Sequence, residues 1–197
     1  MEHRLARRGD FIILWGMLTF TSLGGGAVRC IDGGKAILAF PSKPSGKDIN
    51  LLSVPEETPQ EGVISWPGEY DLDQVAIRGI GHDEGKKVSY SVEVEGVRCA
   101  FLSSPLHDWS DHELELLGDV DVLCIPADDV KLAQKIIDEV DPRVLIPLPT
   151  KNEDTFSELL RVCGAQGKES QDDYKLKSKA SLPMEGREVV ILTSRKE

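Results

Sequence analysis

The stretch LGDVDVLCIPADDVKLAQKIIDEVDPRVLIP, residues 117–147, decides the fold class because it alternates two hydrophobic patterns. Residues 120–125 and 143–147 are short apolar runs that predict buried strands. Between them, residues 128–140 have the spacing of an amphipathic helix, which ends before Pro142 because the residue preceding proline avoids helical backbone angles. A strand, a helix and another strand in this order indicate a parallel sheet covered by helices.

The chain upstream of this unit contains only strand patterns, which are short apolar runs separated by turn residues. The strands expected there are 17–23, 27–31, 35–40, 49–54, 63–66, 74–80, 87–94 and 97–102. Further helices are expected at 111–117 and 154–163, and late strands at 174–179 and 188–193. Ser110 and Glu113 form a capping-box pattern at the first helix. Strands first and helices later predict an α/β (α+β) sandwich of two sheets with outer helices.

The first sixteen residues are expected to be an extension, and residues 17–197 one domain. Residues 1–8 are basic and residues 11–20 apolar, as in a signal peptide. Gly9 and Asp10 interrupt the pattern, and the apolar stretch is too short for a membrane-spanning helix. A genuine segment, a signal-like sequence and a misassigned start all stay open, and no membrane association is expected.

Charge and cysteine usage narrow the functional classes. The chain has 23 basic and 34 acidic residues, a formal net charge of −11, which argues against nucleic-acid binding because that binding depends on lysine and arginine. Its four cysteines are widely separated and form no C-x-x-C pair. We therefore expect a cytoplasmic protein with no nucleic-acid partner.

Five segments in series resemble one known family. They are VISWPGEYD (63–71), VAIRGI (75–80), LGDVDVL (117–123), DPRVLIP (141–147) and SLPME (181–185). Together they are similar to a small bacterial and archaeal family of metallo-β-lactamase-fold proteins, described as zinc-dependent hydrolases of the β-lactamase fold. The resemblance covers roughly residues 17–193 and implies an αββα sandwich.

The resemblance also implies where metal ligands would lie. Hydrolases of this fold bind zinc through a His-x-His-x-Asp-His turn, an aspartate after a later strand and further histidines. The corresponding positions here are Val54, Glu56, Thr58, Pro59, Ser104 and Pro149. These residues lack imidazole, so they predict a vestigial metal site, no cofactor and a non-catalytic protein, a pseudoenzyme. Such a protein would bind a small molecule or a protein partner.

One alternative is a metal-dependent hydrolase of phosphoester, lactone or amide substrates with a relocated site, which would use zinc. The candidate catalytic residues are His107 and Asp108, an imidazole and a carboxylate in adjacent positions. His82 is expected at a solvated hairpin tip, and His112 on the water-facing side of the first helix.

A second alternative is a subunit of a homo-oligomer. In this hypothesis apolar side chains such as Phe40, Val54 and Leu148 fill the emptied cleft. Residues 67–70 are expected to form a turn, with Glu69 and Tyr70 hydrogen-bonding across the vestigial site.

Overall fold

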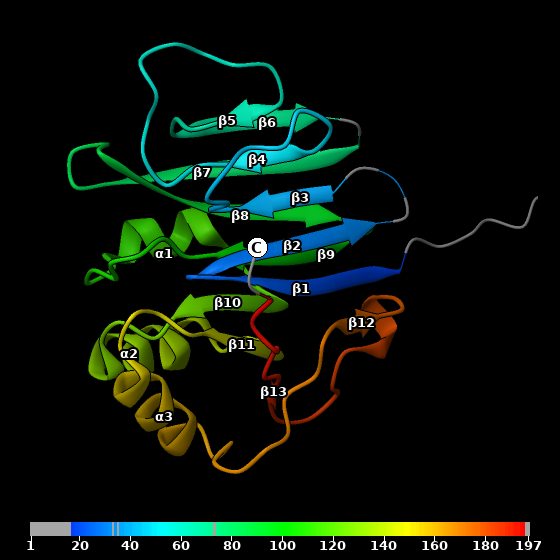
Figure 1. Cartoon of the computed structure of the whole chain (residues 1–197), viewed down its shortest axis with the longest axis vertical. Coiled ribbons are helices and arrows are strands. Elements are labelled where there is room, and N and C mark those ends of the chain that lie inside the picture. The colour runs from blue at the N-terminus through cyan, green and yellow to red at the C-terminus, as the bar shows by residue number, and fades with distance from the viewer. Residues whose placement is uncertain (1–16, 33, 35, 73, 196–197) are drawn as a thin grey trace, which may run out of the picture.

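The computed structural model describes residues 17–32, 34, 36–72 and 74–195. These residues form two β-sheets packed face to face, with α-helices against one of them (Figure 1). The N-terminal extension predicted for residues 1–16 lies outside the described residues. None of the described helices is long and apolar enough to cross a membrane.

The first sheet has six strands in the order β12-β1-β2-β3-β4-β5. Strands β12, β1, β2 and β3 pair antiparallel, whereas β3, β4 and β5 pair parallel. Their bounds are β1 (Leu18–Gly24), β2 (Ala27–Asp32), β3 (Ala36–Ala39), β4 (Ile49–Leu51), β5 (Val63–Ile64) and β12 (Tyr174–Leu176).

The second sheet has seven strands in the order β13-β11-β10-β9-β8-β7-β6. Strands β6 to β9 form an antiparallel meander, and β9, β10, β11 and β13 are parallel. The bounds are β6 (Gly68–Leu72), β7 (Val75–His82), β8 (Lys87–Val94), β9 (Val97–Phe101), β10 (Val122–Pro126), β11 (Val144–Leu148) and β13 (Glu188–Val189).

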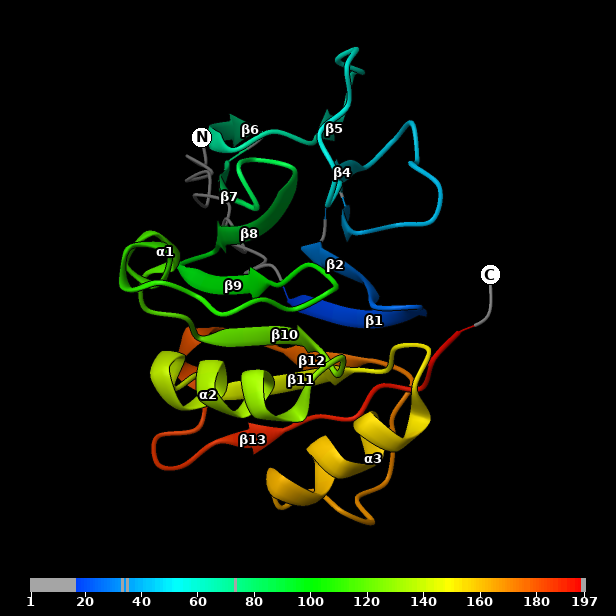
Figure 2. The same ribbon diagram turned by 90° about the vertical axis from the view of Figure 1, so that its left-hand side faces the viewer.

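The helices are α1 (Asp111–Leu117), α2 (Val130–Val140) and α3 (Glu153–Val162), with a short 3-10 turn η1 (Lys179–Ser181). Figure 2 shows α2 and α3 on the viewer's side of β10, β11 and β13. Each α-helix begins at a residue whose side chain accepts a backbone N–H, namely Ser110, Asp129 and Asn152. The capping box of Ser110 and Glu113 is confirmed.

Alternation along the strands creates two cores, because successive side chains point to opposite faces of a sheet. Val88, Tyr90, Val92 and Val94 of β8 face the six-stranded sheet and join the core between the sheets. The Tyr90 hydroxyl donates to the carbonyls of residues 52 and 64, at 2.6 and 2.9 Å, and so connects the two sheets. The second core lies between the seven-stranded sheet and the three α-helices.

The predicted two-sheet sandwich is confirmed, but the strands expected at 49–54, 174–179 and 188–193 are shorter in the structure, and one predicted turn is wrong. Residues 68–72 form edge strand β6, not the predicted turn. Glu69 pairs with Arg78 at 2.6 Å, and the Tyr70 hydroxyl donates to the Trp66 carbonyl at 2.9 Å. Both side chains therefore stabilise the edge of the sheet, and the prediction that they bond across the vestigial site is wrong.

Candidate metal centre

His82 is the last residue of β7 and lies on its helix-facing side. It shares that side with Ile80, which belongs to the core beneath the helices, whereas Ile77 belongs to the core between the sheets. Only 3% of His82 is exposed. The prediction of a solvated hairpin tip is wrong, because the turn consists of residues 83–86 and the strand extends as far as the histidine.

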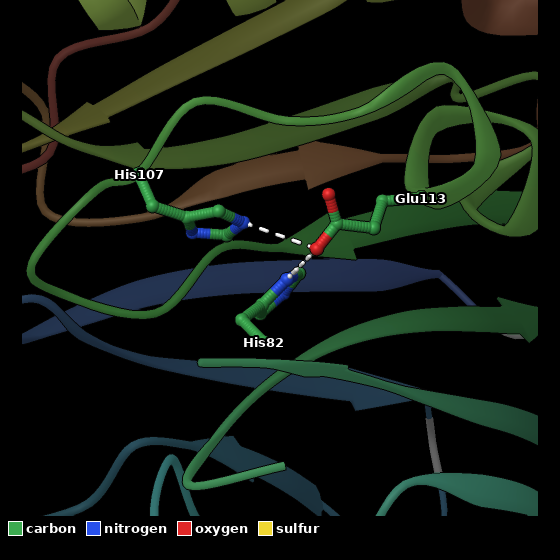
Figure 3. Close-up of side chains that lie close together, drawn as sticks. All are labelled: His82, His107 and Glu113. Carbon is green, nitrogen blue, oxygen red and sulfur yellow. Dashed lines mark hydrogen bonds and ion pairs between the residues drawn. The ribbon is translucent and has the colours of Figure 1, made fainter. Parts of the chain in front are cut away.

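Glu113 lies in the first turn of α1, where its two carboxylate oxygens have separate partners. Oε2 accepts hydrogen bonds from the Ser110 backbone N–H and hydroxyl, both at 2.7 Å. Oε1 lies 2.6 Å from Nδ1 of His82 and 3.3 Å from Nε2 of His107 (Figure 3). The helix cap thus fixes one oxygen and leaves the other facing two imidazoles.

His107 comes from the loop between β9 and α1, and its side chain is 33% exposed. Its ring centroid lies 3.9 Å from that of His82. Trp109, which is 4% exposed, packs against both rings, with centroids 4.6 Å from His82 and 5.4 Å from His107. The tryptophan closes the inner side of the cluster, so solvent reaches it on the His107 side.

The surroundings give two of these groups definite protonation states at neutral pH. Burial lowers the pKa of His82, and this effect outweighs the opposing effect of the hydrogen bond that His82 donates to Glu113. Burial acts to raise the pKa of Glu113, but hydrogen bonds from the Ser110 N–H, His82 and the Ser110 hydroxyl lower it to about 2. His82 is therefore neutral and Glu113 ionised, the states in which imidazole and carboxylate bind metals.

The remaining nitrogen of His82 has no partner. Nε2 is buried and forms no hydrogen bond with any described residue. Nδ1 faces Oε1 of Glu113, so His82 would offer a shared metal ion its Nδ1 lone pair and keep its proton on Nε2.

His82, His107 and Glu113 each offer a ligand atom, and these atoms lie within 4.8 Å of one another. Two ligands about 2.05 Å from a tetrahedral zinc ion are about 3.3 Å apart. The 3.3 Å separation of Glu113 and His107 matches this spacing, whereas the 2.6 Å hydrogen bond to His82 would have to lengthen. Two histidines and a glutamate form a known catalytic zinc ligand set, and this donor set fits the metal.

The structure separates the two predicted catalytic residues. Asp108 is exposed and pairs with Lys135 at 2.6 Å, while His107 contacts Glu113. His112 is exposed, in agreement with the prediction. Sequence reasoning identified Glu113 only as a cap and gave His82 no role, and no local signal joins them because they are 31 residues apart.

The six positions at which the family resemblance placed metal ligands do not form a second centre. Val54 and Glu56 line a cavity of about 290 Å³, while Thr58, Pro59 and Ser104 are exposed and Pro149 is half-buried. Among the residues that the structure describes, no group of metal-binding side chains includes any of them. Valine and proline side chains have no donor atom, so this set does not fit zinc.

The hypothesis that apolar side chains fill the family cleft has mixed support. Leu148 is buried between the sheets, but Val54 is 50% exposed and Phe40 lines the cavity. The cleft therefore retains open space beside Phe40, and the expected homo-oligomer stays a prediction.

Comparison with solved structures defines the class of protein. One similar structure is a metallo-β-lactamase superfamily protein from Thermotoga maritima, which is proposed to be a Zn-dependent hydrolase. It is 22% identical to this chain, and the alignment covers 90% of this chain and 100% of that one, with a TM-score of 0.73. A protein from Parabacteroides distasonis, proposed to be a metal-dependent hydrolase, is 15% identical over 90% of this chain and 94% of its own, with a TM-score of 0.61. The chain thus has the metallo-β-lactamase fold.

More distant similarity extends to another kind of metal enzyme. CmlA, a diiron β-hydroxylase from Streptomyces venezuelae, is 11% identical, with 82% of this chain and 54% of CmlA covered and a TM-score of 0.54. No curated protein is similar enough to count as a relative. The model of the β-lactamase superfamily domain matches residues 52–149, about half of the sequence, and the chain belongs to this superfamily.

These findings correct the expectation that the protein needs no cofactor. That expectation considered only the ligand positions of the family motif, and it was wrong to extend their loss to the whole chain. The group formed by His82, His107 and Glu113 can hold a metal, and the similar structures include a proposed Zn-dependent hydrolase and a diiron enzyme. The candidate metal ligands are therefore residues other than the six family positions.

Proposed function

We propose that the chain is a metal-dependent hydrolase whose metal is held by His82, His107 and Glu113. The observation that carries the proposal is the convergence of three ligand atoms within 4.8 Å of one another, with Oε1 of Glu113 2.6 Å from Nδ1 of His82 and 3.3 Å from Nε2 of His107. The superfamily and the proposed hydrolase activities of similar proteins support it. The substrate classes we propose are phosphoesters, lactones and amides.

Each residue has a distinct task in this proposal. Strand β7 and the Trp109 ring hold His82 in one orientation, and the Ser110 N–H and hydroxyl fix Glu113. His107 lies on a loop and is partly exposed, so substrate approaches from its side. His82, His107 and Glu113 would hold the metal, which when bound would lower the pKa of a water molecule toward neutrality and so supply the nucleophile that hydrolysis of these substrates requires.

Hydrolysis assays test this function directly. We would assay the chelated and zinc-reconstituted protein with bis-p-nitrophenyl phosphate, an aryl amide and a simple lactone. The proposal predicts zinc-dependent turnover of at least one substrate, abolished by His107→Ala and kept by His112→Ala, a matched exposed histidine. Turnover that His107→Ala leaves unchanged would contradict it.

A further inference from the structure

The cavity beside the family's ligand positions has features of a second binding site, and it shares no lining residue with the candidate metal centre. Its volume is about 290 Å³, and Phe40, Pro41, Leu52 and residues 53–56 line it. Phe40 follows β3 and Leu52 follows β4, so the cavity lies where these two parallel strands end. Its size suits a small ligand rather than a peptide.

Glu56 is held firmly at this cavity. Its backbone N–H donates to the Ser65 hydroxyl at 3.1 Å, and its carbonyl accepts from the Trp66 indole at 3.0 Å. Gln60 donates to Oε1 at 2.9 Å. The main chain and one carboxylate oxygen therefore have partners supplied by the protein.

The other oxygen, Oε2, is buried and accepts no hydrogen bond from any described residue. None of the ion pairs among the described residues involves Glu56. A buried carboxylate oxygen without a donor is costly, so the site needs an N–H or O–H group from outside the described chain. Charged donors form the strongest hydrogen bonds with carboxylates.

The residues that line the cavity indicate which kind of molecule would supply this hydrogen-bond donor. Phe40, Pro41, Leu52, Val54 and Pro55 are apolar, and an aromatic ring favours a nearby cation. Phe40 has a left-handed backbone conformation, with φ of 55°, and its ring packs on Tyr90 at a centroid distance of 6.1 Å. Bulky residues rarely adopt this conformation, and such backbone outliers concentrate at binding sites.

We propose that this cavity binds the ammonium group of a small aliphatic amine, with Glu56 as the hydrogen-bond acceptor and Phe40 as the apolar wall. The formal net charge of −11 favours a cationic ligand by raising its local concentration. A neutral alcohol of the same length would keep the apolar contacts but lose the charge-assisted hydrogen bond. The proposal is independent of the metal centre, because it shares no residue with it.

The test is an NMR titration of the metal-free full chain with n-butylammonium, with 1-butanol and tetramethylammonium as parallel probes. We expect n-butylammonium to shift backbone resonances of residues 52–56 and to bind roughly tenfold or more tightly than 1-butanol. Tetramethylammonium, which has no N–H donor, should also bind more weakly. Equal binding of all three probes, or no shift of these residues, would overturn the proposal.

Three variants make the test specific. Glu56→Gln should weaken n-butylammonium binding by roughly tenfold or more, because it removes the charge, whereas Glu57→Gln changes the adjacent exposed carboxylate and should leave binding unchanged. Phe40→Leu should weaken binding by a smaller factor, through loss of the aromatic ring. Thermal melts establish that each variant is folded. Equal affinity of wild-type protein and folded Glu56→Gln would contradict the assignment.

Discussion

Nδ1 of His82 lies 2.6 Å from Oε1 of Glu113, and this contact joins the end of β7 to the first turn of α1. The same carboxylate caps the helix through its other oxygen. Helix start, buried histidine and candidate metal centre therefore depend on one side chain. Changes in the protonation or the identity of either residue should affect both stability and metal binding.

Lowering the pH should destabilise the metal-free protein in the pH range over which His82 gains a proton. Because burial lowers its folded-state pKa below the ordinary 6.5, the unfolded chain binds the extra proton more readily. The stability from the neutral ring is present above pH 6.5 and is lost as the pH falls below that value. Urea unfolding from pH 8 to 5 should show this decline, and folded His82→Gln should lack it. An identical decline in the variant would refute this origin.

Protonation of Glu113 should destabilise the protein in a second, more acidic pH range. Its folded-state pKa of about 2 lies below the ordinary 4.5, so its contribution is present above pH 4.5 and is lost as the pH falls toward 2. Glu113→Gln should also weaken the cap of α1 and reduce the free energy of unfolding at pH 7 by about 1–2 kcal/mol. Glu115→Gln, on the same helix and exposed, should change it by less than about 0.5 kcal/mol. Similar values for the two variants would argue against a special role of Glu113.

The segment Trp66-Pro67 should make Gly79 intolerant of a side chain. A Cβ atom added at Gly79 would lie 2.7 Å from the Trp66 carbonyl oxygen, so Gly79→Ala should destabilise the fold by about 1–3 kcal/mol. Gly46→Ala is the control, because nothing lies within 4 Å of its added Cβ. Chemical unfolding of both variants checks this, and equal stabilities would mean that the two segments do not pack so closely.

Local sequence signals were sufficient for most of the fold. The helix from Asp111 to Leu117 was predicted with its bounds, because the capping box specifies the start. Strand β6 was missed because Gly68 follows Pro67, two residues typical of turns, and its exposed side chains show no buried alternation. Pairing with β7, which is a tertiary interaction, determines that it is a strand.

The candidate site was predicted only in part for the same reason. His107 was recognised as a candidate, but its partner is Glu113 and not the adjacent Asp108. The burial of His82 depends on Trp109 and α1, which come from later parts of the chain. Residue patterns specify local caps and strand faces, whereas a ligand set assembled from a strand end, a loop and a helix requires the three-dimensional arrangement.

The measurement that tests the account most directly is elemental analysis of the untagged protein, purified without chelator and equilibrated with zinc. We expect about one equivalent of metal in the wild-type protein, less than about a tenth of an equivalent in folded His82→Gln and His107→Ala, and the wild-type content in His112→Ala. Bound zinc should also raise the melting temperature of the wild-type protein, since a ligand of the native state stabilises it. A metal-free wild-type protein, or a His82→Gln variant that keeps its zinc, would contradict a centre formed by His82, His107 and Glu113.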